Sequence, residues 1–198
     1  MPVRLLLLVA ALAVPLASAA APDPEAPARS RALVAAFVKV PAAPGPARDR
    51  AFATLDGFLA LEELVSGAVA PRAARFSPKE LARFKETFRE VLRLVAYTES
   101  GSFFRKAKLT WGEARAEGEE TAVPAKVSVP AEDLQTEIEF RWRRVGGALK
   151  VVDVAFEGDS LLKDYQSQLA RIVDKSGPAG LQKAVDERRA ELAREPGK

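Results

Sequence analysis

The 198-residue chain is predicted to form an α+β domain: N-terminal helices, then a four-stranded antiparallel curved sheet, then C-terminal helices packed on one face of that sheet. Two observations predict this fold class. Before residue 101, apolar residues recur every three to four positions, as on the buried face of a helix. After residue 101, apolar and polar residues alternate, as in strands with one buried face, and beyond residue 158 the helical spacing returns.

The N-terminal segment, residues 1–21, has the composition of a signal peptide. Arg4 supplies the positive charge, the apolar run over residues 5–16 is too short to cross a bilayer, and the Ala-Ser-Ala at 17–19 suits a signal peptidase. Residues 22–29 are rich in Pro and Ala, and we expect a flexible tether without packing contacts. An exported protein without cysteine fits the periplasm, which is the predicted location.

The composition excludes most enzyme classes. The chain has no histidine and no cysteine, so histidine-dependent catalysis, cysteine nucleophiles and the usual zinc, copper and iron ligand sets are impossible. We therefore predict no catalytic residue, no metal site and no cofactor; Asp153 is the one carboxylate that a pocket enzyme could use. A formal net charge of +3 gives no support for nucleic-acid binding. We expect a non-enzymatic monomer whose single domain covers residues 30–195.

Helices occupy the first half of the predicted domain. Ser30 is placed to cap a helix over residues 31–40, a second helix covers residues 47–55, and a third ends at Pro71. In the first and third of these, the apolar residues fall along one side, so each should bury that face.

The clearest local motif begins a long helix at residue 77. Ser77 is the N-cap, Pro78 occupies the first helical position, and Glu80 completes a capping box. The apolar residues that follow are spaced by threes and fours. We expect this helix to end near Thr98, before Gly101.

Four strands are predicted from the alternation, over residues 103–115, 121–129, 133–144 and 149–156. The third alternates most regularly, with apolar residues on one face and charged residues on the other. The fourth is apolar on both sides and should lie in the interior of the sheet. Two helices close the chain, one capped near Asp159 and one beginning at Pro178.

The end of the predicted sheet resembles a family signature. Residues 149–162, Leu-Lys-Val-Val-Asp-Val-Ala-Phe-Glu-Gly-Asp-Ser-Leu-Leu, followed by Tyr-Gln-Ser-Gln-Leu at 165–169, resemble the strand-to-helix signature of the MlaC family, also called toluene-tolerance proteins. Segments 58–64 and 77–88 agree with the family at the level of pattern. Asp159 and Gln166 depart from it, as in a divergent member. The fold that we expect is accordingly an NTF2-like cone.

This resemblance implies a periplasmic phospholipid carrier of the system that maintains outer-membrane lipid asymmetry. Its partners would be phospholipid, an inner-membrane ABC permease complex with its substrate-binding ring, and an outer-membrane lipoprotein complex. The acyl tails would lie in an apolar cavity between helices and sheet. The candidate wall residues are large or branched apolar side chains: Phe84, Phe88, Leu92, Val127, Ile138, Phe140, Trp142, Val154, Leu162, Tyr165 and Leu169.

Two alternatives to a carrier remain open from the residues alone: an interaction module, and a hydrolase or isomerase with the carboxylate of Asp153 inside its pocket. Each of these side chains could be ordinary core, which would make the chain an exported, non-enzymatic interaction module with a filled core. The segment 157–160 could shape a cavity mouth, or Gly158 could simply form a turn and Asp159 or Ser160 cap a helix. Asp153 is expected to pair with an arginine or a backbone N–H group.

Overall fold

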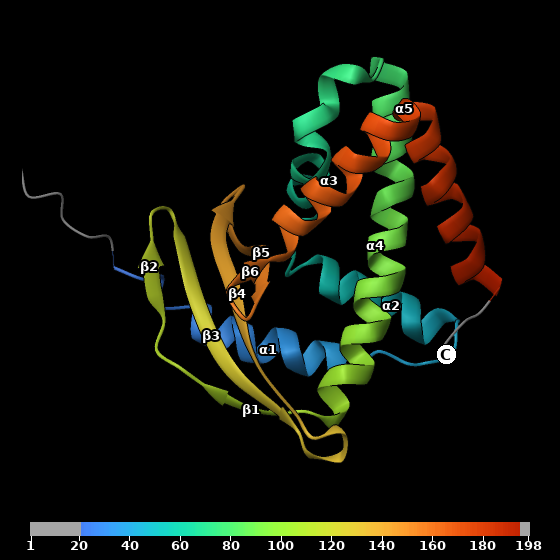
Figure 1. Ribbon diagram of the computed structural model, residues 1–198. Coiled ribbons are helices and arrows are strands. Elements are labelled where there is room, and N and C mark those ends of the chain that lie inside the picture. The colour runs from blue at the N-terminus through green and yellow to red at the C-terminus, as the bar shows by residue number, and fades with distance from the viewer. Residues whose placement is uncertain (1–20, 195–198) are drawn as a thin grey trace, which may run out of the picture.

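The computed structural model describes residues 21–194, so the expected signal peptide lies outside the described residues except for Ala21. The predicted α+β architecture is confirmed: helices cover one side of a curved antiparallel sheet (Figure 1). The α-helices are α1 (Ala26–Val38), α2 (Pro46–Asp56), α3 (Leu61–Val69), α4 (Pro78–Lys106) and α5 (Leu161–Arg194), and two short 3₁₀ helices cover Ala70–Arg75 and Pro130–Glu132.

The sheet has six strands where four were predicted. They are β1 (Lys108–Trp111), β2 (Arg115–Glu117), β3 (Glu120–Val129), β4 (Leu134–Val145), β5 (Ala148–Phe156) and β6 (Asp159–Ser160). Their order is β1-β3-β4-β5-β6, with β2 also paired to β3, and every pairing is antiparallel. The prediction of one strand over residues 103–115 is wrong at both ends: residues 103–106 belong to α4, β1 is short, and β2 begins only at Arg115. The turn after β5 adds the short β6.

The edge of β5 is covered by a segment from the helical part of the chain. The N–H of Val151 donates to the carbonyl of Phe58 at 2.8 Å, and the N–H of Ala60 donates to the carbonyl of Val151 at 2.9 Å. Leu59 thereby forms an isolated parallel bridge with Val151. These bonds satisfy backbone groups that an edge strand would otherwise leave open.

Helix α4 begins as predicted but ends later. Both bonds of the Ser77–Glu80 capping box are present. The helix then continues to Lys106, so the expected end near Thr98 is wrong, and Gly101 lies inside it. The reason is close packing: a Cβ at Gly101 would lie 2.8 Å from the carbonyl oxygen of Phe37 on α1. Glycine is required there because the two helices touch, and the helix does not break.

Helix α1 begins five residues earlier than predicted, at Ala26, which is fully buried. The N–H of Asp23 donates to Thr121 Oγ1 at 2.8 Å, and Arg144 Nη2 lies 2.9 Å from the Asp23 carboxylate. The expectation of a contact-free tether over residues 22–29 is therefore wrong, because this segment packs on the ends of β3 and β4.

Ser30 lies inside α1 and is not its N-cap. Its side chain is fully buried, and Trp142 Nε1 on β4 donates a hydrogen bond to Ser30 Oγ at 2.8 Å. The Ser30 hydroxyl donates in turn to the carbonyl of Ala26 at 2.9 Å. This pair of bonds fixes α1 across the inner face of the sheet.

The described residues form two apolar clusters, which we call the sheet core and the helical core. The sheet core joins α1, α2, the sheet and the C-terminal half of α4, with members such as Phe37, Tyr97, Phe104, Phe140 and Trp142. The helical core joins α3, the N-terminal half of α4 and α5, with members such as Val65, Phe84, Phe88, Leu169 and Leu181. Among the helices and strands of residues 21–194, α4 alone contributes buried side chains to both cores.

An ion-pair cluster ties α5 to the segment after α3. Asp174 accepts from Arg72 Nε at 2.7 Å and from Arg72 Nη2 at 2.6 Å, and Arg75 Nη1 adds a third contact at 3.1 Å. The Arg72 hydrogen bonds hold the pKa of Asp174 below its usual value. Three residues later, α5 bends at Gly177, whose φ of 68° is left-handed, and Pro178 restarts the helix as predicted.

The Ser30–Trp142 bond can be tested by substitution. Ser30→Ala leaves the buried indole N–H without an acceptor, which should cost about 1–3 kcal/mol of the free energy of unfolding. Urea unfolding followed by circular dichroism measures it. Ser102→Ala, at an exposed position on α4, is the control and should change the free energy by no more than about 0.5 kcal/mol. Equal stabilities for the two variants would contradict the importance of the bond.

The Asp174 cluster predicts a pH dependence. Because the pKa of Asp174 is lowered in the folded state, its contribution is complete above the ordinary aspartate value of about 3.9 and is lost as the pH falls below it. The melting temperature of the wild type should therefore exceed that of Asp174→Asn by a constant margin above about pH 5. The margin should shrink at lower pH. A margin that grows on acidification would refute this account.

Candidate functional site

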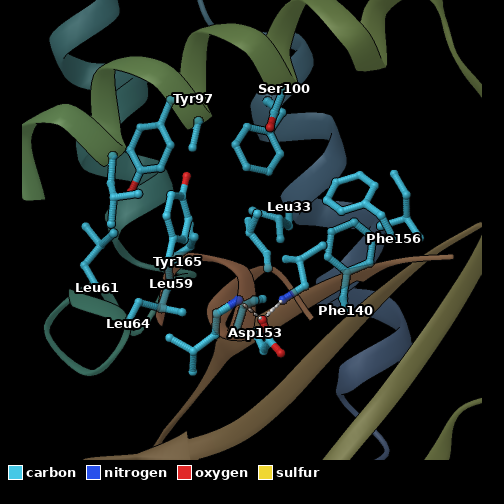
Figure 2. Close-up of a pocket in the computed structure, with 18 of the residues that line it drawn as sticks. Leu33, Leu59, Leu61, Leu64, Tyr97, Ser100, Phe140, Asp153, Phe156 and Tyr165 are labelled. Atoms are coloured by element: carbon cyan, nitrogen blue, oxygen red, sulfur yellow. Dashed lines mark hydrogen bonds between the residues drawn. The ribbon is translucent and has the colours of Figure 1, made fainter. Parts of the chain in front are cut away.

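A mostly apolar cavity of about 110 Å³ lies where the two cores meet. Its walls come from α1, the 59–64 segment, the C-terminal half of α4, strands β4 and β5, and the first turns of α5 (Figure 2). In Figure 2, Tyr97 and Ser100 project from α4 toward the sheet, Leu33 of α1 lies below Ser100, and Phe140 and Asp153 lie on the sheet side. The cavity occupies the position where the sequence predicted one, between helices and sheet.

Six of the eleven candidate wall residues line this cavity: Leu92, Ile138, Phe140, Val154, Leu162 and Tyr165. The other five belong to the packed clusters outside the lining: Phe84, Phe88 and Leu169 in the helical core, and Val127 and Trp142 in the sheet core. Phe84 and Phe88 stack with ring centroids 5.3 Å apart, and Trp142 is held by Ser30. Each of these five side chains packs against other members of its own cluster.

The candidate wall residues predicted from the sequence include none from the first 80 residues, yet that part of the chain lines the cavity. Leu33 and Phe37 from α1, and Leu59, Leu61 and Leu64 from the segment around α3, all line the cavity. Their apolar spacing indicated only that each helix has a buried face. Which face meets a void depends on the crossing of α1 over the sheet and on the Leu59–Val151 bridge, and neither leaves a local signal in the sequence.

Asp153 reaches the cavity wall, and each of its carboxylate oxygens already accepts a hydrogen bond from a backbone N–H or a hydroxyl group. Oδ1 accepts from the N–H of Val154 at 2.9 Å and from the N–H of Leu162 at 3.0 Å, and Oδ2 accepts from the Ser160 hydroxyl at 2.5 Å. Ser160 Oγ accepts from the N–H of Lys163 at 3.1 Å. The expected pairing with a backbone N–H is confirmed: Asp153 joins β5 to the N-terminus of α5.

Tyr97 presents its ring to the cavity and turns its hydroxyl away from it. The hydroxyl donates to Asp56 Oδ1 at 2.8 Å, and Arg93 holds the same carboxylate through Nε at 3.0 Å and Nη2 at 2.9 Å. Burial, with the hydrogen bond to Asp56 added, raises the pKa of Tyr97 far above its usual value. The phenol therefore stays neutral and contributes an apolar wall.

Tyr165, on the first turns of α5, packs edge-on against Phe88 with ring centroids 5.6 Å apart. Burial, and secondarily the charge of Glu99, raises the pKa of its hydroxyl. The hydroxyl is therefore protonated at neutral pH. Asp153 and Tyr97 are engaged by other protein groups, and the rest of the lining is apolar except for Ser100 and the Tyr165 hydroxyl.

Two further findings concern residues 21–194, the part of the chain that the structure describes. No group of three or more acidic side chains among residues 21–194 is arranged to hold a metal ion. None of the helices in that part of the chain has both the length and the apolar character to cross a membrane.

A mostly apolar cavity between helices and sheet has the chemistry to hold an apolar ligand. The sequence model of the MlaC protein family matches residues 34–187, and the chain belongs to that family. The family consists of phospholipid-binding transport proteins without enzymatic activity, which confirms both the resemblance and the expectation of a non-enzyme. A search of curated proteins found no match.

A solved structure shares the fold. It is the phospholipid-binding protein from Ralstonia solanacearum in complex with a phospholipid, and it aligns with a TM-score of 0.63 at 17% sequence identity. The alignment covers 86% of this chain and 99% of that one. At this identity the likeness establishes the architecture only.

The role of Asp153 can be tested by two substitutions. Asp153→Ala removes the acceptor of the Leu162 N–H at the start of α5 and should cost about 1–3 kcal/mol of the free energy of unfolding. Asp153→Asn keeps one carbonyl oxygen for Val154 and Leu162, so it should lose less. Chemical denaturation measures both. If Asp153→Asn is as unstable as the alanine variant, the cap is not what Asp153 provides.

Proposed function

We propose that this chain is a periplasmic phospholipid carrier that holds acyl-tail methylenes in the cavity between α1, α4, α5 and the sheet. The observation that carries the proposal is a mostly apolar cavity, with its Tyr97 hydroxyl and Asp153 carboxylate already bonded, in a member of a phospholipid-binding family. Of the eleven candidate residues, the six that line the cavity are the proposed lipid contacts. The other five support the walls from behind.

Water sets the physical need for a carrier. Each methylene exposed to water costs about 0.8 kcal/mol, so a two-tailed lipid with roughly 30 methylenes would cost on the order of 20 kcal/mol to move unshielded. An apolar cavity removes that cost without any chemistry. A chain with neither histidine nor cysteine is suited to such a task.

The size of the cavity says how cargo is accommodated. One water molecule needs about 10–15 Å³ of cavity volume on this measure. The cavity of about 110 Å³ therefore holds on the order of ten groups the size of a water molecule. That space suits part of one acyl tail. A complete two-tailed lipid requires the cavity walls to move apart. The walls can separate at the boundary between the sheet core and the helical core, because the residues of each core pack mainly against other residues of the same core.

Family membership supports the wider role. We propose that the chain moves phospholipid between an outer-membrane lipoprotein complex and an inner-membrane ABC permease complex with its substrate-binding ring, with the N-terminal segment directing export. The carrier would act as a monomer. The alternative of an exported interaction module with a filled core predicts no bound lipid.

Native mass spectrometry tests the proposal. Protein exported by bacterial cells should carry a mass increment of a phospholipid, and delipidated protein should regain it from vesicles of phosphatidylethanolamine and phosphatidylglycerol. A protein that is lipid-free when isolated and takes up nothing from vesicles would refute the carrier and favour the interaction module.

Filling the cavity is the matched test by mutation. Ala96 lines the cavity on α4, and Ala96→Phe places a ring in it, so lipid uptake should fall about tenfold or more. Ala53→Phe, at an exposed position on α2, adds the same ring outside the cavity and should leave uptake unchanged. Circular dichroism of both variants controls for folding. Equal uptake by the two would place the lipid elsewhere.

A further inference from the structure

Phe156, at the end of β5, combines two properties. It lines the cavity, and its side chain is 43% exposed to solvent. The other residues lining this cavity are buried or half-buried. The apolar surface of the cavity therefore continues to the outside of the molecule at this ring.

The backbone after Phe156 is held in place, so the exposure of the ring does not come from a loose loop. Glu157 has a φ of 50° and Gly158 a φ of 87°, which turns the chain sharply into β6. The N–H of Glu157 donates to the carbonyl of Glu137 at 3.0 Å, and Glu157 Oε1 accepts from the N–H of Glu137 at 2.7 Å. On the strand itself, Phe156 stands opposite Ile138, another lining residue.

The two ends of the cavity differ. Figure 2 places Phe156 beside Phe140 at one end, and Leu61 and Leu64 at the opposite end. Leu61 and Leu64 are half-buried and Phe140 is buried, whereas Phe156 faces solvent. An acyl tail entering beside Phe156 would run along Phe140 toward the 59–64 segment, and its headgroup would remain outside the β5–β6 turn.

We propose that the cavity is entered at the β5–β6 turn and that Phe156 is its portal residue, whose ring contacts the acyl tail of a phospholipid as the tail passes between water and cavity. This inference rests on the proposed carrier function and adds to it the entry point and the orientation of the cargo. A ring at this position covers methylenes that would otherwise meet water during transfer. It should therefore govern the rate of loading more than the final occupancy.

The absence of cysteine makes a site-specific test possible. Phe156→Cys creates a single thiol at the portal, which can be conjugated to a maleimide carrying a short poly(ethylene glycol) chain. Leu134→Cys is the matched control, because Leu134 is an apolar strand residue with 38% exposure that does not line the cavity. Vesicles of phosphatidylethanolamine and phosphatidylglycerol containing a phospholipid with a fluorescent acyl chain report the rate of uptake.

The conjugate at position 156 should load lipid about tenfold more slowly than wild type, and the conjugate at position 134 should load at the wild-type rate. Phe156→Trp, which keeps an apolar ring, should also load normally, and Phe156→Ser should be slow without any conjugate. Urea unfolding of each protein separates blocked entry from lost folding.

Normal loading by both the 156 conjugate and Phe156→Ser would overturn the portal while leaving the carrier intact. Equally slow loading by the 134 conjugate would also overturn the portal, because a conjugate away from the cavity would then slow lipid uptake as much as one at position 156. Wild-type protein that takes up no lipid would refute the proposed function, and the portal with it.

Discussion

The structure depends on one long helix being shared by two cores. Helix α4 buries Phe84 and Phe88 against α3 and α5 at one end, and Tyr97 and Phe104 against α1, α2 and the sheet at the other. The helix can extend this far because Gly101 lets it pass α1 at backbone contact distance. Since each cluster packs mainly within itself, the junction between them is left incompletely filled, and the cavity lies there.

The polar groups at this junction explain why its lining is apolar. The carboxylate of Asp153 accepts hydrogen bonds from the end of β5 and the start of α5. The Tyr97 hydroxyl donates to Asp56, which does not line the cavity. Both arrangements satisfy a buried polar group with partners from the protein, as buried groups require. Both groups are thereby engaged by the protein itself, and the remaining lining of the cavity is mostly apolar.

Much of the fold could be predicted because its signals are local. The capping box at Ser77 and Glu80, the alternation of β3 and β4, and the helix restart at Pro178 all depend on residues close in sequence. The errors occurred where a distant partner decided the outcome. By local sequence Gly101 indicates a helix end, but it lies within α4 because α1 packs against it. By local sequence Ser30 indicates a helix cap, but its hydroxyl accepts the hydrogen bond of Trp142 instead.

For the site, the sequence alone determined that the interior is apolar, that histidine and cysteine chemistry is impossible, and that residues 149–169 resemble a lipid-carrier family. Only the tertiary structure decided which apolar residues face the void: Phe84 and Trp142 are packed core, whereas Leu33, Leu59 and Phe156 line the cavity. The physical reason is that periodicity tells which face of an element is buried. A void is a property of several faces together, set by how the elements cross.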